Sequence, residues 1–367
     1  MPSFDFLIVG AGPFGSTFAR RAADVGLKPL VIDCRPHIAG NMFDERVNGI
    51  NVHRYGPHIF HTNDERVWEF VNQFATFVQY EHRVKGTKDG IVFPVPVNLM
   101  TMYILWGVTT PQQAAEKIEQ TRVHCDNPTN LEDWILSQIG TDLYELVVKG
   151  YTEKQWGRSC RELPARIIKR LPIRMTWDDR YHGDRYSALP EEGYSGLIGN
   201  VLDGIPVELG VDYFDDRDRW DAKAKMVVYT GPIDRFFDYC HGELQYRALR
   251  FELEERQGDV QGCPQLNFTA PDVPHTRCME WKHFERLECD HTIITHEYPQ
   301  EWSRGAEPYY PISDERNMAV YRQYDKLAKE LTHKYLFGGR LGTYKYMDMD
   351  QVFGQALRFA DRVLKSR

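Results

Sequence analysis

The N-terminal segment alternates between short apolar runs and a glycine-rich turn. Phe4 to Val9 is an apolar run of strand length, and Pro29 to Asp33 is a second one. Between them, apolar residues recur at helical spacing at Phe14, Phe18, Ala22 and Val25, and Gly26 follows. A change of period from strand to helix and back to strand predicts one βαβ unit.

The pattern then becomes helical, and later strand-like. Residues 98–170 are predicted to be mainly helical, because Thr109 and Thr110 precede Pro111 and Asn130 lies three residues before Asp133, both typical helix starts. From about 171 to 315 short strands and turns are expected. The predicted strands there are Pro206 to Phe214, Met226 to Thr230, Arg247 to Leu253 and His291 to Thr295.

The C-terminal part returns to an α/β pattern. Tyr335 to Phe337 is a predicted strand, and a helix is predicted from about Met349 to Leu364. That helix carries one apolar face, formed by Val352, Phe353, Ala356, Ala360 and Val363. Because the βαβ unit and this α/β segment lie at opposite ends of the chain, we expect a nucleotide-binding fold assembled from both.

Composition limits the classes of protein that fit. With 367 residues, 42% hydrophobic and 27% charged, the chain suits a soluble globular protein of more than one domain. A net charge of −8 excludes an overall basic surface for nucleic acid. The seven cysteines are odd in number and form no CxxC pair, which favours a reducing compartment. Without a signal-peptide pattern or a membrane-spanning apolar stretch, we expect a cytoplasmic protein with no membrane insertion.

The turn after the first strand has the spacing of a dinucleotide-binding loop. Gly10 permits a tight turn, Gly12 lets the backbone approach a pyrophosphate, and Gly15 lets helix and strand pack closely. The helix N-terminus supplies amide donors, and Asp33 ends the second strand, where an acid meets ribose hydroxyls. A purely structural role for the glycines is the alternative, and the motif by itself does not separate FAD from NAD.

Three later segments favour FAD. Arg35 to Asn41, Met226 to Pro232, and Gly338 to Arg340 each resemble a segment of flavoproteins of the oxidase and reductase superfamily. The last helix would point its N-terminus, near Asp348 and Met349, at the flavin and stabilise negative charge on the reduced ring. Arg340 is placed to pair with the FAD pyrophosphate.

Six further motifs, in order along the chain, carry a closer resemblance. They are Tyr55 to Asn63, Lys149 to Gly157, Leu163 to Pro172, Val273 to Arg277, Glu307 to Pro311, and Gly338 to Met349. Together they are similar to the bacterial UDP-galactopyranose mutase family, and the resemblance runs from Phe4 to the final helix. It implies an FAD-binding domain at 1–78, 190–235 and 316–367, a helical domain with a mobile substrate flap at 98–170, and an antiparallel sheet domain at 79–97, 171–189 and 236–315. A homodimer is expected by analogy.

The resemblance also assigns roles to residues. Arg170 and Arg277 would clamp the UDP diphosphate and stabilise its charge during catalysis, as two planar cationic forks suit a diphosphate. Tyr151 would stack on uracil and Trp156, on a loop, would belong to the flap. Further substrate-binding residues would be Tyr181, Asn267, Tyr310 and Tyr346. The cofactor would be held by Gly10, Gly12, Phe14, Gly15, Asp33, Arg35, Gly40, Asn41, His58, His61, Arg340, Asp348 and Met349, with His61 also catalytic. No metal is expected.

The implied activity is interconversion of UDP-galactopyranose and UDP-galactofuranose, supplying galactofuranose for cell-surface glycans. The implied mechanism needs reduced FAD, whose N5 attacks the anomeric carbon to form a flavin–sugar adduct, with no net redox change. Two alternatives remain open at this point. One is a flavin oxidoreductase, which would consume NADPH or oxygen, and the other is a non-catalytic nucleotide-sugar binding protein.

Overall fold

The computed structural model describes residues 2–165 and 173–365, so the predicted substrate residue Arg170 lies outside the described residues. Its N-terminal βαβ unit forms as predicted, with strand β1 at Phe4–Val9, helix α1 at Pro13–Asp24 and strand β2 at Pro29–Asp33. All pairings in this sheet are parallel. The five-stranded order is β10 (Val207–Leu209), β2, β1, β11 (Ala224–Tyr229), β17 (Tyr335–Phe337).

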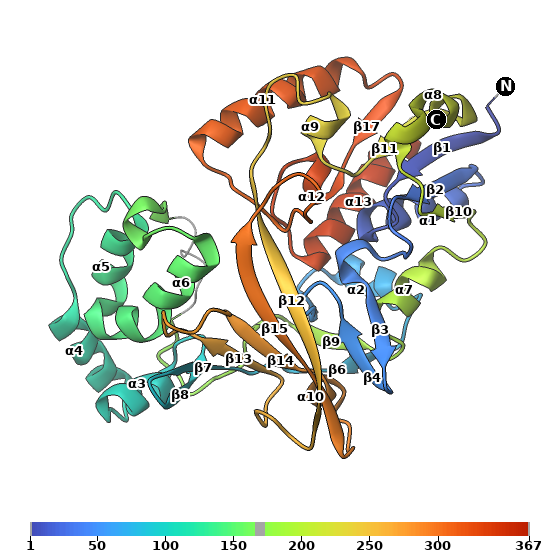
Figure 1. The fold of residues 1–367 in the computed structure, drawn as a ribbon. Coiled ribbons are helices and arrows are strands. Elements are labelled where there is room, and N and C mark those ends of the chain that lie inside the picture. Colours follow the sequence, from blue (N-terminus) through green and yellow to red (C-terminus); the bar gives the residue numbers. More distant parts are fainter. Residues whose placement is uncertain (1, 166–172, 366–367) are drawn as a thin grey trace.

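Helices cover both faces of the parallel sheet (Figure 1). Helix α13 (Met349–Lys365) packs against α1, and its buried residues include Phe353, Ala356 and Ala360, so the predicted apolar face is confirmed. Helix α8 (Arg217–Lys223) contributes Trp220 to the apolar cluster of the opposite face. Strands from the beginning, middle and end of the chain therefore form one layered α/β unit, as the fold-class prediction requires.

A second, seven-stranded sheet extends away from this unit (Figure 1). It is mostly antiparallel, with one parallel pair between β13 and β7. Its order is β16 (Tyr310–Pro311), β12 (Tyr246–Gln257), β15 (His291–Glu301), β14 (Arg277–Glu280), β13 (Gln265–Phe268), β7 (Val84–Lys88), β8 (Ile91–Val95). The prediction of short strands was wrong for β12 and β15, which pair with each other along nearly their whole length. The strand predicted over 206–214 is limited to β10, and a 3₁₀ turn follows at Tyr213–Asp216.

The helical part covers the far end of the seven-stranded sheet (Figure 1). It contains α3 (Leu99–Trp106), α4 (Pro111–Thr121), α5 (Leu131–Leu143), a π-helical turn at Tyr144–Val148, and α6 (Lys149–Trp156). The predicted caps are confirmed, since Thr110 accepts from the Gln113 amide and Asn130 from the Asp133 amide. Trp156 is the last residue of α6 rather than part of a loop, so that prediction was wrong.

Smaller elements join these parts. A hairpin pairs β3 (Asp44–Val47) with β4 (Ile50–His53), and β9 (Tyr186–Pro190) lies between β5 (Phe60–Thr62) and β6 (Phe77–Gln79). The remaining named helices are α2 (Glu65–Val71), α7 (Gly193–Val201), α9 (Ile233–Phe236), α10 (Lys282–Glu285), α11 (Glu315–Glu330) and α12 (Gly339–Gly342). Within the described ranges, no helix is both long and apolar enough to cross a membrane. The three domain boundaries stay a prediction.

Candidate active site

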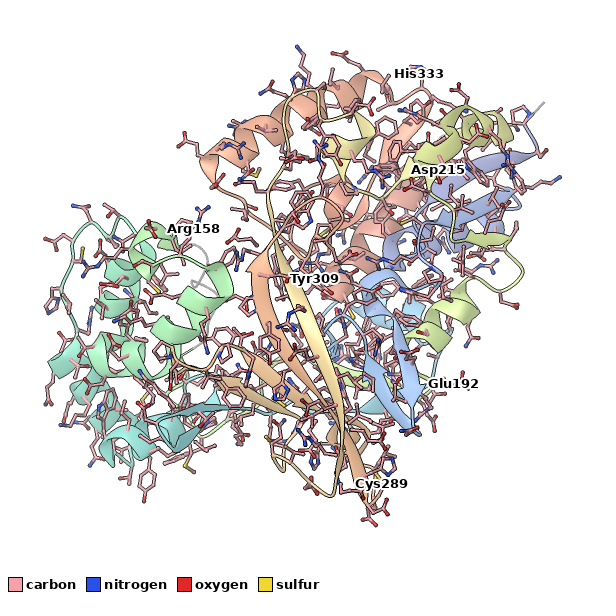
Figure 2. The ribbon with its side chains drawn as sticks, viewed as in Figure 1. Arg158, Glu192, Asp215, Cys289, Tyr309 and His333 are labelled. Atoms are coloured by element: carbon pink, nitrogen blue, oxygen red, sulfur yellow. The ribbon has the colours of Figure 1, made fainter. Side chains whose placement is uncertain are left out.

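A cavity of about 1190 Å³ is lined by the parallel-sheet unit, the seven-stranded sheet and the helical part together. Its walls include the loop after β1, the segment 55–61, the inner face of α6, and the segments 302–310 and 339–349. Tyr309, labelled near the centre of Figure 2, belongs to this wall. Pockets for one small ligand measure about 300–1000 Å³, so this cavity exceeds the upper end of that range.

The glycines after β1 are required by close backbone contacts. A Cβ on Gly10 would lie 2.0 Å from Thr230 Oγ1, and one on Gly15 would lie 2.0 Å from the Gly10 carbonyl oxygen. A Cβ on Gly40, which has a φ of +56°, would lie 3.1 Å from the Cα of Gly12. No side chain caps the N-terminus of α1, so its first amides are available to an anion. These contacts form a cradle that suits a pyrophosphate.

Asp33 fixes the shape of this cradle. Its Oδ2 accepts from the Ala11 amide at 2.7 Å, and its Oδ1 accepts from the Arg35 amide at 2.9 Å. The carboxylate lines the cavity and keeps lone pairs for a further donor, as the prediction of a ribose contact requires. Phe14 also lines the cavity, yet its ring packs so closely on Gly338 that a Cβ there would lie 2.1 Å from Phe14 Cζ.

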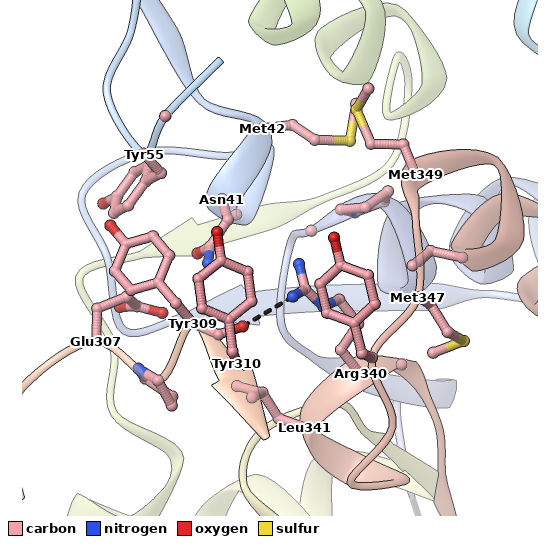
Figure 3. A pocket seen from close by; sticks show the side chains of 18 of the residues that line it. Asn41, Met42, Tyr55, Glu307, Tyr309, Tyr310, Arg340, Leu341, Met347 and Met349 are labelled. Carbon is pink, nitrogen blue, oxygen red and sulfur yellow. Dashed lines mark hydrogen bonds between the residues drawn. The ribbon is translucent and has the colours of Figure 1, made fainter. Parts of the chain in front are cut away.

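Arg35 belongs to a polar cluster whose members come from separate sequence motifs. Its guanidinium donates to Asn41 Oδ1 at 2.7 Å, forms an ion pair with Glu307, and lies 4.7 Å from the centre of the Tyr55 ring. Figure 3 shows Tyr55, Asn41 and Glu307 together on one wall of the pocket. Segments far apart in sequence thus fix the Arg35 side chain at the edge of the cradle.

The opposite wall carries Arg340 and the start of α13. Arg340 donates to the Tyr309 carbonyl oxygen at 2.8 Å, the contact dashed in Figure 3, and its guanidinium lies 4.8 Å from the centre of the Tyr346 ring. Asp348 and Met349 line the cavity at the N-terminal end of α13, as predicted. The positive end of this helix dipole therefore faces the cavity.

His58 is a neutral histidine of the cavity wall. Burial, helped by nearby His53, lowers the pKa of His58 to about 3. Its backbone amide donates to His53 Nδ1 at 3.0 Å, whereas its own Nδ1 is buried without a hydrogen-bond partner. An orphaned polar atom in a cavity wall costs free energy unless a ligand satisfies it, so His58 fits a bound polar group.

His61 has a different environment. Its Nδ1 lies 2.6 Å from Asp184 Oδ2, and its ring stacks on His182 with centroids 3.6 Å apart and planes 14° from parallel. All three residues line the cavity. Burial lowers the pKa of His182 to about 3, so His182 is neutral at physiological pH.

Arg277 is held by a buried carboxylate. Its Nε donates to Glu297 Oε1 at 2.9 Å, a second N–H of the guanidinium donates to Oε2, and Glu297 is fully buried. The Arg277 side chain is 18% exposed and lines the cavity, so the fork keeps donors for an anionic ligand. Burial raises the pKa of Tyr151 and of Tyr310, and Arg277 opposes both shifts. Both phenols are therefore neutral donors beside this cation.

Helix α6 presents one face to the cavity. Tyr151, Thr152, Gln155 and Trp156 all line it, at the one-turn spacing that places residues on one side of a helix. Two cationic side chains hold the helix in place through hydrogen bonds to backbone carbonyl oxygens. Lys154 donates to three carbonyl oxygens of the 268–275 loop, and the buried Arg247 donates to the Gln155 carbonyl oxygen at 3.0 Å.

Comparison with known proteins indicates the family of this chain. The family model described as UDP-galactopyranose mutase matches residues 146–346, and one described as an NAD(P)-binding Rossmann-like domain matches residues 8–74. A Klebsiella pneumoniae protein named "Probable UDP-galactopyranose mutase" is 41% identical over 100% of this chain and 96% of its own length. The chain belongs to the UDP-galactopyranose mutase family. The predicted family is thereby confirmed.

Other relatives widen the substrates named in this family. The dTDP-fucopyranose mutase of Escherichia coli is 38% identical, with 98% of each chain covered. Among solved structures, a reduced UDP-galactopyranose mutase has a TM-score of 0.75 at 15% identity over 99% of this chain and 96% of that one. Putrescine oxidase has a TM-score of 0.59 at 11% identity, with 99% of each chain covered. At these identities the structural likeness concerns the fold alone.

Within the described part of this family member, two groups of His, Asp and Glu side chains come close together. In the first, the His61 and His182 rings are nearly parallel, so their in-plane lone pairs do not converge on one ion. In the second, of Asp259, Glu280 and His283, the Lys282 ammonium already lies 3.3 Å from Asp259 Oδ2. We interpret neither as a metal site, and the absence of a metal stays a prediction.

The structure brings most predicted site residues of this mutase-family chain to one cavity. They are Gly10, Gly12, Phe14, Gly15, Asp33, Arg35, Gly40, Asn41, His58, His61, Tyr151, Trp156, Tyr181, Arg277, Tyr310, Arg340, Tyr346, Asp348 and Met349. Asn267 is not among the lining residues. It accepts from Gln265 Nε2 at 2.8 Å, and Gln265 is the residue at the wall.

Several site residues escaped the sequence reasoning. Glu307 stands in a quoted motif and Asp184 follows Tyr181 by three residues, but neither position carries a local signal for its partner. Glu297 pairs with Arg277 only because β14 and β15 are adjacent antiparallel strands with these two residues opposite each other. Such contacts depend on strand register, which local sequence does not encode.

Proposed function

We propose that the chain is an FAD-dependent isomerase that interconverts UDP-galactopyranose and UDP-galactofuranose. The observation that carries this proposal is a single cavity in which the dinucleotide cradle of α1 continues to the paired Arg277 and the inner face of α6. A cation held by a buried carboxylate beside neutral phenols suits the diphosphate of a nucleotide sugar. The family membership supports the same reading.

FAD would be held by residues that fit it. The uncapped N-terminus of α1 and the close approach of Gly12 to Gly40 suit its pyrophosphate, and Asp33 suits a ribose hydroxyl. The orphaned Nδ1 of His58 and the N-terminus of α13 suit the polar edge of a flavin ring. When bound and reduced, FAD supplies an electron-rich nitrogen nucleophile that the protein itself lacks.

The protein's own part is to bind, orient and shield the substrate. Arg277, with Arg170, would hold the diphosphate and stabilise the charge that gathers on it when the sugar bond breaks. Tyr151 offers a ring for the base, and Tyr181, Tyr310 and Tyr346 offer hydroxyls to substrate oxygens. Trp156, at the end of α6, would close over the substrate and exclude water. Asn267 would act indirectly, by holding the side chain of Gln265 at the cavity wall.

A second substrate has support of its own. The dTDP-fucopyranose mutase of E. coli is nearly as similar to this chain as the K. pneumoniae relative, at 38% against 41% identity. The base-binding and diphosphate-binding features described above serve a thymidine diphosphate sugar as well. The same fold and the same isomerisation would then act on a 6-deoxy sugar.

The test is conversion of each nucleotide sugar by the purified protein, measured by chromatography with and without dithionite. We expect UDP-galactofuranose to yield UDP-galactopyranose only after reduction, faster than the dTDP-fucose pair reacts. The opposite preference would establish the second substrate. Steady consumption of NADPH or oxygen with product would instead indicate an oxidoreductase, and binding without conversion a nucleotide-sugar binding protein.

The expected homodimer and cytoplasmic location belong to the same proposal, as does a role in supplying galactofuranose to cell-surface glycans. One surface suits a second copy: Met100, Tyr103 and Ile104 lie on one face of α3 and are 42%, 48% and 37% exposed. Light scattering should give twice the chain mass of 42.9 kDa. A monomer mass would overturn the dimer without affecting the proposed activity.

A further inference from the structure

Asp184 holds His61 in a defined orientation. The 2.6 Å contact joins His61 Nδ1 to Asp184 Oδ2, while Asn63 Nδ2 donates to the other carboxylate oxygen, Oδ1. Asn63 is fixed in turn, because its own Oδ1 accepts from the Arg185 amide at 2.8 Å. The carboxylate therefore cannot rotate freely, and it sets which ring nitrogen of His61 carries a proton toward it.

The second ring nitrogen of His61 is left for a ligand. Among the described residues, no hydrogen bond engages His61 Nε2, and His61 lines the cavity. With Nδ1–H donated to Asp184, the neutral imidazole presents a lone pair at Nε2, on the far side of the ring. This is the arrangement in which a carboxylate orients a histidine that exchanges protons through its other nitrogen.

The groups around the His61 ring favour His61 as the residue that exchanges a proton in this part of the cavity. His182 covers one face of the ring and stays neutral, because burial lowers the pKa of His182 to about 3. Asp350 of α13 also interacts electrostatically with His61; burial raises the pKa of Asp350, and its carboxylate accepts from Thr62 Oγ1 at 3.0 Å. Two carboxyl groups and a neutral ring therefore surround this imidazole.

The proposed reaction includes a proton transfer between two sugar oxygens, whichever sugar is used. In the pyranose the ring oxygen is O5 and O4 carries a hydrogen; in the furanose the roles are exchanged. Converting one to the other breaks C1–O5, forms C1–O4, removes a proton from O4 and adds one to O5. The nucleoside diphosphate ends on C1 as it began, and no electrons are gained or lost.

Resting on the function proposed above, we propose that His61, oriented by Asp184, carries this proton between the two hydroxyls of the sugar. Nε2 takes the proton from the hydroxyl that will close the new ring, and the resulting imidazolium is stabilised by Asp184. Nε2 then gives this proton to the old ring oxygen as its bond to C1 breaks, and the deprotonated oxygen closes on C1 to form the new ring. Asp184 is a positioning residue, and His61 is the group that meets the substrate.

The decisive variant is Asp184→Asn, which keeps the shape of the side chain and removes its charge. We expect kcat to fall by about 10²-fold, within the usual range for general acid–base catalysis, with KM and FAD content unchanged. Asp184→Glu should restore part of the rate, which a merely structural role would not predict.

A readout independent of turnover is the NMR resonance of the proton on His61 Nδ1, which should shift in Asp184→Asn because a neutral amide replaces the charged acceptor. His61→Gln, and the double variant that also carries Asp184→Asn, should each lose no more kcat than about the factor lost by Asp184→Asn alone, because the two residues act as one unit. Asp325→Asn, in an exposed pair with Lys329 on α11, is the control and should behave as wild type.

The outcomes separate this inference from the proposed function. If wild type isomerises its substrate and Asp184→Asn retains kcat within about threefold, the proton role is overturned and the mutase proposal stands. Additive losses in the double variant would likewise overturn it. If wild type converts neither nucleotide sugar after reduction, both fall together.

Discussion

At the scale of single residues, Arg277 illustrates how a binding cation is prepared before any ligand arrives. Glu297 accepts from two of its N–H groups and accepts also from Thr276 Oγ1, at 3.0 Å. A buried ion pair adds little net stability, because desolvation offsets the attraction. Its value here is geometric, since it fixes the plane of the guanidinium at the cavity wall.

We therefore expect Arg277→Lys to raise the Kd for UDP by about 10- to 100-fold, because a single ammonium cannot serve Glu297 and a diphosphate as a fork does. Isothermal titration with UDP checks this. Arg250→Lys makes the same change at an exposed position of β12 and should leave the Kd unchanged. An unchanged Kd for Arg277→Lys would remove Arg277 from the diphosphate site.

At the scale of elements, the position of α6 depends on one glycine. A Cβ on Gly150 would lie 2.1 Å from the Thr269 carbonyl oxygen, so the helix rests directly on the loop that follows β13. Thr269 Oγ1 donates to the Leu146 carbonyl oxygen at 2.7 Å, and Lys154 donates to the same loop. These contacts carry Tyr151 and Trp156 to the cavity.

The variant Gly150→Ala should push α6 away from this loop. We expect a free energy of unfolding lower by about 1–3 kcal/mol, as for other overpacked sites, with weaker UDP binding and normal FAD content. Urea unfolding and UDP titration measure the two effects.

Gly199→Ala in α7 is the matched control for this substitution, since its Cβ would meet only Ile38 Cδ1 at 3.8 Å. Helix propensity should make the control neutral or slightly stabilising. If Gly150→Ala behaved in the same way, α6 would not depend on this contact.

At the scale of the whole molecule, buried histidines tie stability to pH. Burial lowers the pKa of His53 and of His82 to about 4, and that of His58 and of His182 to about 3. Their ordinary value is 6.5. Between these values the unfolded chain binds protons that the folded chain does not. The contribution of these histidines to the free energy of unfolding is therefore fully present above pH 6.5 and is lost as the pH falls.

We expect the urea midpoint to fall steadily between about pH 6.5 and about pH 4, with each of these histidines contributing on the order of 3 kcal/mol at most. His82→Gln removes one such group and should make the loss shallower. A midpoint that stays constant over this range would mean that these histidines are exposed to water in solution.

The sequence alone determined the elements whose signals are local. The strands at Phe4–Val9 and Tyr335–Phe337 and the helix beginning at Met349 lie where the periodicity predicted them, because side-chain alternation and glycine turns act over a few residues. The glycine loop with Asp33 predicted the cradle for the same reason. Six co-linear motifs predicted the family, which the comparisons confirm.

Only the tertiary structure decided which distant side chains meet. His61 and Asp184 are 123 residues apart in sequence and 2.6 Å apart in space. Arg277 meets Glu297 through the register of the short strand β14 against β15, which is longer than the sequence predicted. The family resemblance assigned Asn267 to the site, yet Gln265 lines the cavity wall. Periodicity determines which face a residue takes within its element, whereas packing between elements determines which residue stands opposite, and here that packing forms the site.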